Sequence, residues 1–160
     1  MNFLPDPLHP AVVHFPIALT LVALLLETLA RHPRGRALEP AAAVLVVLAA
    51  LGSIATVVTG NLAHDAAVVP PAARELVHRH EELGEIAMWA LVVLALARLA
   101  LVRLNRHRGA VAWLYLVLLA GAAGAVSYNG HLGGQMVFRH GVGTDPVQRS
   151  TVSPSLPTTP

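Results

Sequence analysis

The sequence predicts an all-α integral membrane protein: a bundle of four transmembrane helices that runs up-down-up-down, with both termini on the outer side. Three observations lead to this fold class. Hydrophobic residues make up 55% of the 160 residues and charged residues only 12%, about half the charged share of a soluble domain. The apolar residues gather in four stretches of about 20 residues, the length that crosses a bilayer as a helix. Arginines and histidines gather at the ends of these stretches and between them.

Each apolar stretch is expected to form one span, because a backbone exposed to lipid must satisfy its polar groups within a helix. The expected spans are residues 11–30, 41–60, 84–104 and 109–130. Residues 1–143 are therefore predicted to form one four-span domain. Residues 144–160 are rich in Ser, Thr and Pro, a composition typical of a disordered C-terminal tail.

The arginines predict an orientation. The chain contains no lysine, and three arginines follow the first span within residues 31–36 and three follow the third within residues 103–108. Short loops rich in basic residues stay in the cytoplasm. Both termini and the longer link of residues 61–82 are then expected to face outward.

Seven of the nine histidines are expected at the outer rim, because they lie at the outer ends of all four spans. These seven are His9, His14, His64, His78, His80, His131 and His140. His32 and His107 lie among the arginines of the inner loops, away from this rim, and are not candidate ligands. Imidazole ligates haem iron, copper, zinc and nickel, and helix bundles place such ligands on facing helices.

The first hypothesis is a b-type haem at this rim, in a protein that transfers electrons. The candidate haem ligands are His14, His64, His80 and His131. His14 is favoured, because it is the histidine that lies clearly inside an apolar span. Small residues about one turn from a ligand could open a slot for the macrocycle. Ala18, Gly60 and Gly84 lie one turn from a candidate ligand, and Gly121 and Gly124 share one stripe of the fourth span with His131.

Two other hypotheses remain open. In the second, the protein binds or transports a divalent metal ion through His9, His14, His78, His80 and Glu81. In the third, it is a structural or assembly subunit whose small residues pack against a larger membrane complex, since small residues let membrane helices approach closely.

A buried ion pair is expected at the opposite depth of the bundle. Glu27 in the first span and Arg98 in the third lie at similar distances from the inner face, by the rise of an α-helix. A salt bridge between them would lower the cost of placing either charge in lipid.

Three segments resemble a known family. Residues 8–27 (LHPAVVHFPIALTLVALLLE) and 133–143 (GGQMVFRHGVG) are similar to the opening and closing motifs of a bacterial family of predicted membrane proteins, catalogued as domain of unknown function 2231. Residues 80–84 (HEELG) resemble its motif before the third span. The resemblance covers about residues 8–143 and implies a four-helix membrane protein. It carries over His9, His14, His80 and His140, whereas His131 departs from the family pattern.

The resemblance also implies a setting. Some members are fused to Rieske or cytochrome modules, which favours electron transfer with an exported redox protein or within a larger complex of the bacterial inner membrane. In the closing motif, Arg139 and His140 could contact haem propionates. A simpler interpretation is a chain reversal over the outer mouth of the bundle, made by the glycines.

Composition also argues against several classes. The absence of cysteine removes disulfides, iron–sulfur clusters and covalent c-type haem. The sequence shows no serine-histidine-acid spacing and no glycine-rich phosphate loop, so a stand-alone hydrolytic enzyme is not expected. The net charge of +2 is not the footprint of a nucleic-acid-binding protein. The lipid bilayer is the expected partner.

Overall fold

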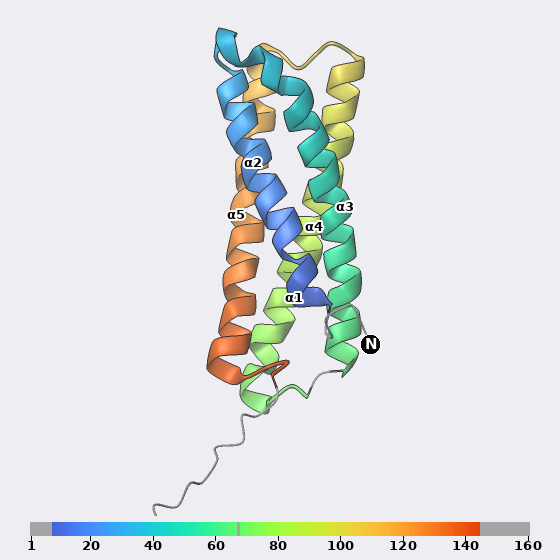
Figure 1. Ribbon diagram of the computed structural model, residues 1–160, viewed down its shortest axis with the longest axis vertical. Helices are drawn as coiled ribbons and strands as arrows, with labels where there is room; N and C mark the ends of the chain where they lie inside the picture. The colour runs from blue at the N-terminus through green and yellow to red at the C-terminus, as the bar shows by residue number, and fades with distance from the viewer. Residues whose placement is uncertain (1–7, 67, 145–160) are drawn as a thin grey trace, which may run out of the picture.

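The computed structural model describes residues 8–66 and 68–144, and these residues form a bundle of long helices (Figure 1). Four helical stretches are long and apolar enough to cross a membrane: His9–Ala30, Pro33–Asp65, Pro71–Arg103 and Gly109–His140. The helical elements in chain order are α1 (His9–Val12), α2 (His14–Ala30), η1 (Pro33–Leu38), α3 (Glu39–Ala66), η2 (Pro71–Ala73), α4 (Arg74–Arg103) and α5 (Gly109–His140). The expected all-helical membrane class is confirmed.

The four long helices pack as a ring. Helix α2 packs against α3, α3 against α4, α4 against α5, and α5 returns to α2, while the short α1 lies against α3. The connections through η1 and through residues 104–108 lie at one end of the bundle, which we call the arginine end (Figure 1). The other end carries the start of α1, the end of α3, the start of α4 and the end of α5. We call it the histidine end.

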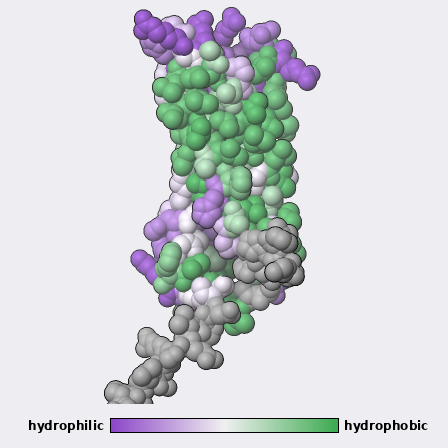
Figure 2. Space-filling model, in the orientation of Figure 1, coloured by the Kyte–Doolittle hydropathy of each residue, from purple (hydrophilic) through white to green (hydrophobic). Residues whose placement is uncertain are grey.

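The surface between the two ends is apolar. Figure 2 shows a broad hydrophobic band, with hydrophilic residues at the top and in the lower third. Large apolar side chains such as Leu25, Leu51, Val93 and Leu114 are more than half exposed. An exposed apolar surface of this extent is not stable in water. It suits a bundle surrounded by lipid chains.

The core is narrow and built largely from small residues. Ala23, Val46, Leu91 and Leu119 are fully buried near the bundle axis. Alanines on every long helix let the backbones approach closely, which is how membrane helices gain packing energy without a hydrophobic driving force. This apolar layer separates the polar groups of the two ends.

The closing motif does not reverse over the mouth of the bundle, so that interpretation is wrong. Residues 133–140 continue α5 as a straight helix. The helix ends at Gly141, which adopts a positive φ of 65°. Its N–H bonds to Val137 O and the N–H of Val142 to Met136 O, and the first of these bonds is that of an αL cap, which glycine accommodates without strain. Val142 then packs on Ala73 and Val77. Of the predicted tail, residues 144–160, only Thr144 belongs to the described residues, and residues 145–160 lie outside them.

Candidate functional sites at the two ends of the bundle

Two imidazoles meet inside the histidine end. The rings of His9 in α1 and His80 in α4 are 6.2 Å apart between centroids and perpendicular to each other. His9 Nδ1 lies 3.0 Å from Thr56 O in α3, and His80 Nδ1 lies 3.1 Å from Asn129 O in α5. A carbonyl oxygen can only accept, so Nδ1 is the protonated nitrogen in both rings. In its neutral form each ring therefore keeps a lone pair at Nε2, the nitrogen that can ligate a metal.

Glycines make room for these rings. A Cβ added at Gly60 would lie 3.1 Å from His9 Cε1, and one added at Gly133 would lie 3.3 Å from His80 Cε1. At Gly84 the nearest atom would be Asn129 Nδ2 at 3.2 Å. The spaces at Gly60 and Gly84 that the sequence suggested for a macrocycle are thus filled by the chain's own side chains.

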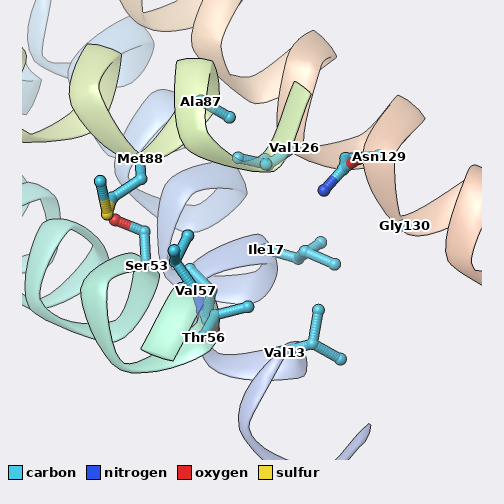
Figure 3. Close-up of a pocket in the computed structure, with 12 residues that line it drawn as sticks. Val13, Ile17, Ser53, Thr56, Val57, Ala87, Met88, Val126, Asn129 and Gly130 are labelled. Carbon is cyan, nitrogen blue, oxygen red and sulfur yellow. The ribbon is translucent and has the colours of Figure 1, made fainter. Parts of the chain in front are cut away.

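A small cavity lies between the long helices, and its lining includes Thr56 and Asn129, the hydrogen-bond partners of the two histidines, but neither imidazole. Its volume is about 40 Å³, which gives room for water. Figure 3 shows the lining from several helices, with Ser53 and Thr56 on α3, Met88 on α4 and Asn129 on α5. Asn129 Oδ1 is buried and has no hydrogen-bond partner in the described part of the chain. A water molecule in the cavity could donate to it.

The other proposed haem ligands are not brought together. His14 is exposed on the surface of α2, and His131 is exposed on α5, where it bonds to Gln135 and stacks on Tyr128. His64 Nδ1 lies 2.6 Å from Glu81 Oε1 near the surface. His80 alone of the four faces another imidazole inside the bundle. His14, the preferred ligand, lies on the side of α2 that faces away from the core.

The remaining candidates lie on the surface of the histidine end. His78 pairs with Glu82 at 3.3 Å, with both side chains exposed. Arg139 is exposed and reaches Gln135 at 3.5 Å, and His140 is partly exposed. Gly121 and Gly124 face outward, with nothing within 4 Å of an added Cβ. Among the described residues no group of three His, Asp or Glu side chains converges to hold a metal ion. Of the proposed metal set, only His9 and His80 meet.

A network of charged side chains is sealed inside the arginine end. Arg98 Nε donates to Glu27 Oε1 at 2.7 Å, and Arg31 Nη2 donates to Glu27 Oε2 at 2.8 Å. Glu27 is fully buried and Arg98 is 1% exposed. Arg98 Nη2 also donates to Glu39 O at 3.2 Å. The structure thus places Glu27 and Arg98 in direct contact, with Arg31 as a second cation on the same carboxylate.

His107 joins this network from the connection between α4 and α5. Its Nε2 lies 2.9 Å from Arg31 Nη2, which can only donate, and 3.1 Å from Glu27 Oε2, which can only accept when ionised. The ring also packs edge-on against Tyr115. Burial lowers the pKa of His107 below its ordinary value of 6.5, and Arg98 and Arg31 lower it further, while Glu27 opposes them. The neutral ring therefore accepts from Arg31.

The two polar sites are separated by the apolar layer of Ala23, Val46, Leu91 and Leu119. The arginine-end network carries one carboxylate against two guanidinium groups and a neutral imidazole. Such a network is suited to holding helices together, because buried opposite charges in good geometry are costly to separate. Ligand chemistry is concentrated at the histidine end.

Residues 5–146 match the family model described as predicted membrane protein, DUF2231. The chain belongs to the DUF2231 family. No curated protein and no solved structure matches it. The family description names a membrane protein and no activity, so an assignment of function to this DUF2231 protein depends on the chemistry of its two polar sites.

Sequence reasoning missed several residues of these sites in the DUF2231 chain. Thr56 and Asn129 contribute backbone carbonyls, which no side-chain pattern reveals. Gly133 belongs to the closing motif, whose glycines were expected to make a chain reversal, and it instead gives the His80 ring close access to the helix. His107 was not considered because it lies in a loop. The sequence did contain a signal for His9. The buried residues of the first span recur every three or four positions from Glu27 back to Pro16. Continued by seven positions, this stripe includes His9 and does not include His14.

Proposed function

We propose that this DUF2231 protein binds one transition-metal ion at its histidine end, through Nε2 of His9 and Nε2 of His80. The observation that carries the proposal is the pair of half-buried imidazoles with both Nδ1 atoms held by helix carbonyls. Histidines that ligate metals commonly donate their other ring N–H to a carbonyl, which fixes the tautomer and the ring orientation.

The spacing of the rings supports this proposal. Two imidazoles bound on opposite sides of one metal, with metal–nitrogen distances of about 2.0–2.1 Å, have centroids roughly 6 Å apart. The His9 and His80 rings are separated by 6.2 Å. Imidazole ligands suit copper, zinc, nickel and iron. Water would complete the coordination sphere.

Haem fits this pair less well than a free ion does. The two imidazoles match the number of axial ligands that a b-type haem needs. The small cavity of about 40 Å³ has no room for a macrocycle with the helices as they stand, and Gly60 and Gly84 are covered by His9 and Asn129. The geometry therefore favours an ion, and electron transfer would require a redox-active one such as copper.

The proposed setting is a bacterial inner membrane. The four spans would cross it up-down-up-down, with the arginine end in the cytoplasm and both termini outward, as the positive-inside rule favours. Arg34, Arg36, Arg103, Arg106 and Arg108 are all exposed at the arginine end. The metal site would then open to the outer side, where an exported redox protein or a larger membrane complex could reach it.

Metal content of the purified protein tests the proposal. Protein in detergent, freed of metal, is titrated separately with copper and with zinc, and the bound ion is counted by elemental analysis. We expect one ion per chain, lost in His9→Ala and in His80→Ala. The matched controls are His14→Ala and His131→Ala, whose exposed rings should not contribute. Ion binding that survives both core substitutions would exclude this site.

A second measurement tests haem as the alternative ligand of the same site. After expression with haem supply, the absorption spectrum should show no Soret band. A Soret band that disappears in His9→Ala and His80→Ala would replace the free ion by haem iron on the same ligands. A band that depends on His14 or His131 instead would overturn the assignment of the pair.

A further inference from the structure

The buried positions of α2 recur in α4. Four of the five buried residues of α2 correspond to a buried residue 71 positions later in α4, and the fifth, Ala30, corresponds to the partly buried Leu101. The matching positions are Pro16, Thr20, Ala23 and Glu27 in α2, and Ala87, Leu91, Leu94 and Arg98 in α4. The residue types differ at all four positions, so the repeat is one of geometry and is not apparent from sequence identity.

The buried positions of α3 recur in α5 in the same way, 73 positions later. The matching positions are Ala42, Ala43, Val46, Ala49, Ala50 and Ser53 in α3, and Tyr115, Leu116, Leu119, Ala122, Ala123 and Val126 in α5. Any two buried helices can be aligned by their period. The correspondence gains meaning because specific polar contacts follow it as well.

The hydrogen bonds of the two histidines follow the same spacings of 71 and 73 positions. His9 reaches Thr56 O, and His80, 71 positions later, reaches Asn129 O, 73 positions after Thr56. Gly60 follows Thr56 by four residues, and Gly133 follows Asn129 by four. Each histidine therefore bonds to a helix of its own half of the chain, through a carbonyl that a glycine one turn later leaves accessible.

The glycine is required by helix geometry. A carbonyl within a helix accepts the N–H of the residue four positions later, so a second donor must approach beside that residue. A Cβ there would lie 3.1 Å from the His9 ring and 3.3 Å from the His80 ring, closer than ordinary contact. The two glycines thus allow the imidazoles to reach the carbonyls.

The residue pairs that meet across the bundle also follow the spacing of 71 positions. Glu27 and Arg98 are equivalent positions of α2 and α4 that meet at 2.7 Å, and His9 and His80 are equivalent positions that meet at the other end. Helices α2 and α4 lie across the ring from each other, since each packs on α3 and α5. Residues that meet across the ring from equivalent positions lie near an axis of rotation.

We infer that the protein consists of two equivalent helical hairpins, His9–Ala66 and Arg74–His140, related by a pseudo-twofold rotation about the bundle axis. Gly60 and Gly133 are then the matching positioning residues of a single site on this axis, which is formed by the imidazoles of His9 and His80. Parallel repeats about an axis along the membrane normal are a known way to build a membrane site. For the ligand, which rests on the proposed function, the consequence is an ion held by two equivalent nitrogens, one from each hairpin.

Nitrogen-15 NMR of the imidazoles tests the site without any metal. The full chain, labelled at histidine and freed of metal, is measured in detergent near pH 7.5, and the signals of the pair are assigned from His9→Asn and His80→Asn. Both rings should be neutral with the proton on Nδ1. Gly60→Ala should change the His9 signals alone, and Gly133→Ala the His80 signals alone. The matched control, Gly124→Ala, has open space at its Cβ and should change neither.

A proton on Nε2 of either ring, or glycine variants that leave their own histidine unchanged, would overturn the inference. These outcomes are independent of the proposed function. A protein that keeps both tautomers and both glycine effects yet binds no ion would lose the metal proposal and retain the repeated site.

Spin-label distances test the rotation itself. The chain has no cysteine, so pairs of labels can be placed directly at exposed, equivalent positions: Leu25 and Val44 in the first hairpin, Leu96 and Val117 in the second. The 25–44 and 96–117 distance distributions should agree, as should the 25–117 and 44–96 distributions. Disagreement within either pair would exclude the twofold relation.

Discussion

At the histidine end the centroids of two perpendicular imidazole rings lie 6.2 Å apart, while at the arginine end a carboxylate and a guanidinium group are in contact at 2.7 Å. Both pairs come from equivalent positions on opposite hairpins. At the histidine end each imidazole is satisfied by its own hairpin, through Thr56 or Asn129. At the arginine end Glu27 accepts from Arg98 of the opposite hairpin, as well as from Arg31 just beyond the end of its own helix.

The difference shows how one geometry can serve two roles. Because each histidine is bonded within its own hairpin, the pair remains free to take a ligand between the hairpins. The small cavity is lined by the hydrogen-bond partners of this pair, Thr56 and Asn129. Contacts between hairpins at the arginine end lock the two halves together and exclude water. Stability should therefore depend on the arginine end, and ligand binding on the histidine end.

The largest expected effect is on stability at the arginine end. Arg98→Met leaves the Glu27 carboxylate buried without its closest partner, and breaking a buried pair in this way costs about 3–5 kcal/mol. Unfolding in detergent should show this loss. Glu27→Gln in combination with Arg98→Met should cost less than the sum of the two single changes, because the residues act on each other.

The exposed ion pair of Arg79 and Glu75, at 2.8 Å, provides the control. Arg79→Gln should leave unfolding unchanged, because exposed pairs contribute little. An Arg98→Met protein as stable as the Arg79→Gln protein would show that the sealed network does not hold the bundle together.

A smaller effect is expected at the histidine end. His80→Ala removes one hydrogen bond to Asn129 O, a carbonyl that keeps its partner within the helix, so the loss should be about 1 kcal/mol. His9→Ala should cost a similar amount, because the two positions are equivalent. The same unfolding measurement compares the two ends directly. A loss at His80 as large as that at Arg98 would remove the contrast between them.

The smallest expected effect is a dependence of stability on pH that comes from His107. Its pKa is lowered in the folded protein relative to the ordinary value of 6.5, so near pH 6.5 the unfolded chain binds a proton that the folded chain excludes. Stability should therefore be complete above pH 6.5 and decline as the pH falls below it. His107→Gln should remove this part of the pH dependence. Identical pH profiles for the two proteins would contradict the placement of the ring in the network.

Much of the fold could be predicted from composition and spacing, because lipid imposes long apolar helices. The contact of Glu27 with Arg98 was foreseeable, since two opposite charges at the same depth of a membrane need each other. The partner of His80 was harder to find. His14 lies deeper in an apolar run than His9, but only His9 falls on the buried stripe that includes Glu27.

Other parts of the sites could not be predicted. The roles of Thr56 and Asn129 are carried by backbone atoms, which have no sequence signature. His107 reaches the buried network because the loop before it turns through Asn105, which has a φ of 52°. A loop conformation of this kind depends on the packed helices around it and is not encoded by a local pattern.

Pulsed EPR of the copper-loaded protein tests the central claim most directly, because it counts the imidazole nitrogens bound to Cu²⁺. We expect two equivalent imidazoles in the unmodified protein and in His14→Ala, and one in either His9→Ala or His80→Ala if copper is retained at all. A copper signal with no imidazole coupling, or one that is unchanged in both His9→Ala and His80→Ala, would contradict the assignment of these two rings as the ligands.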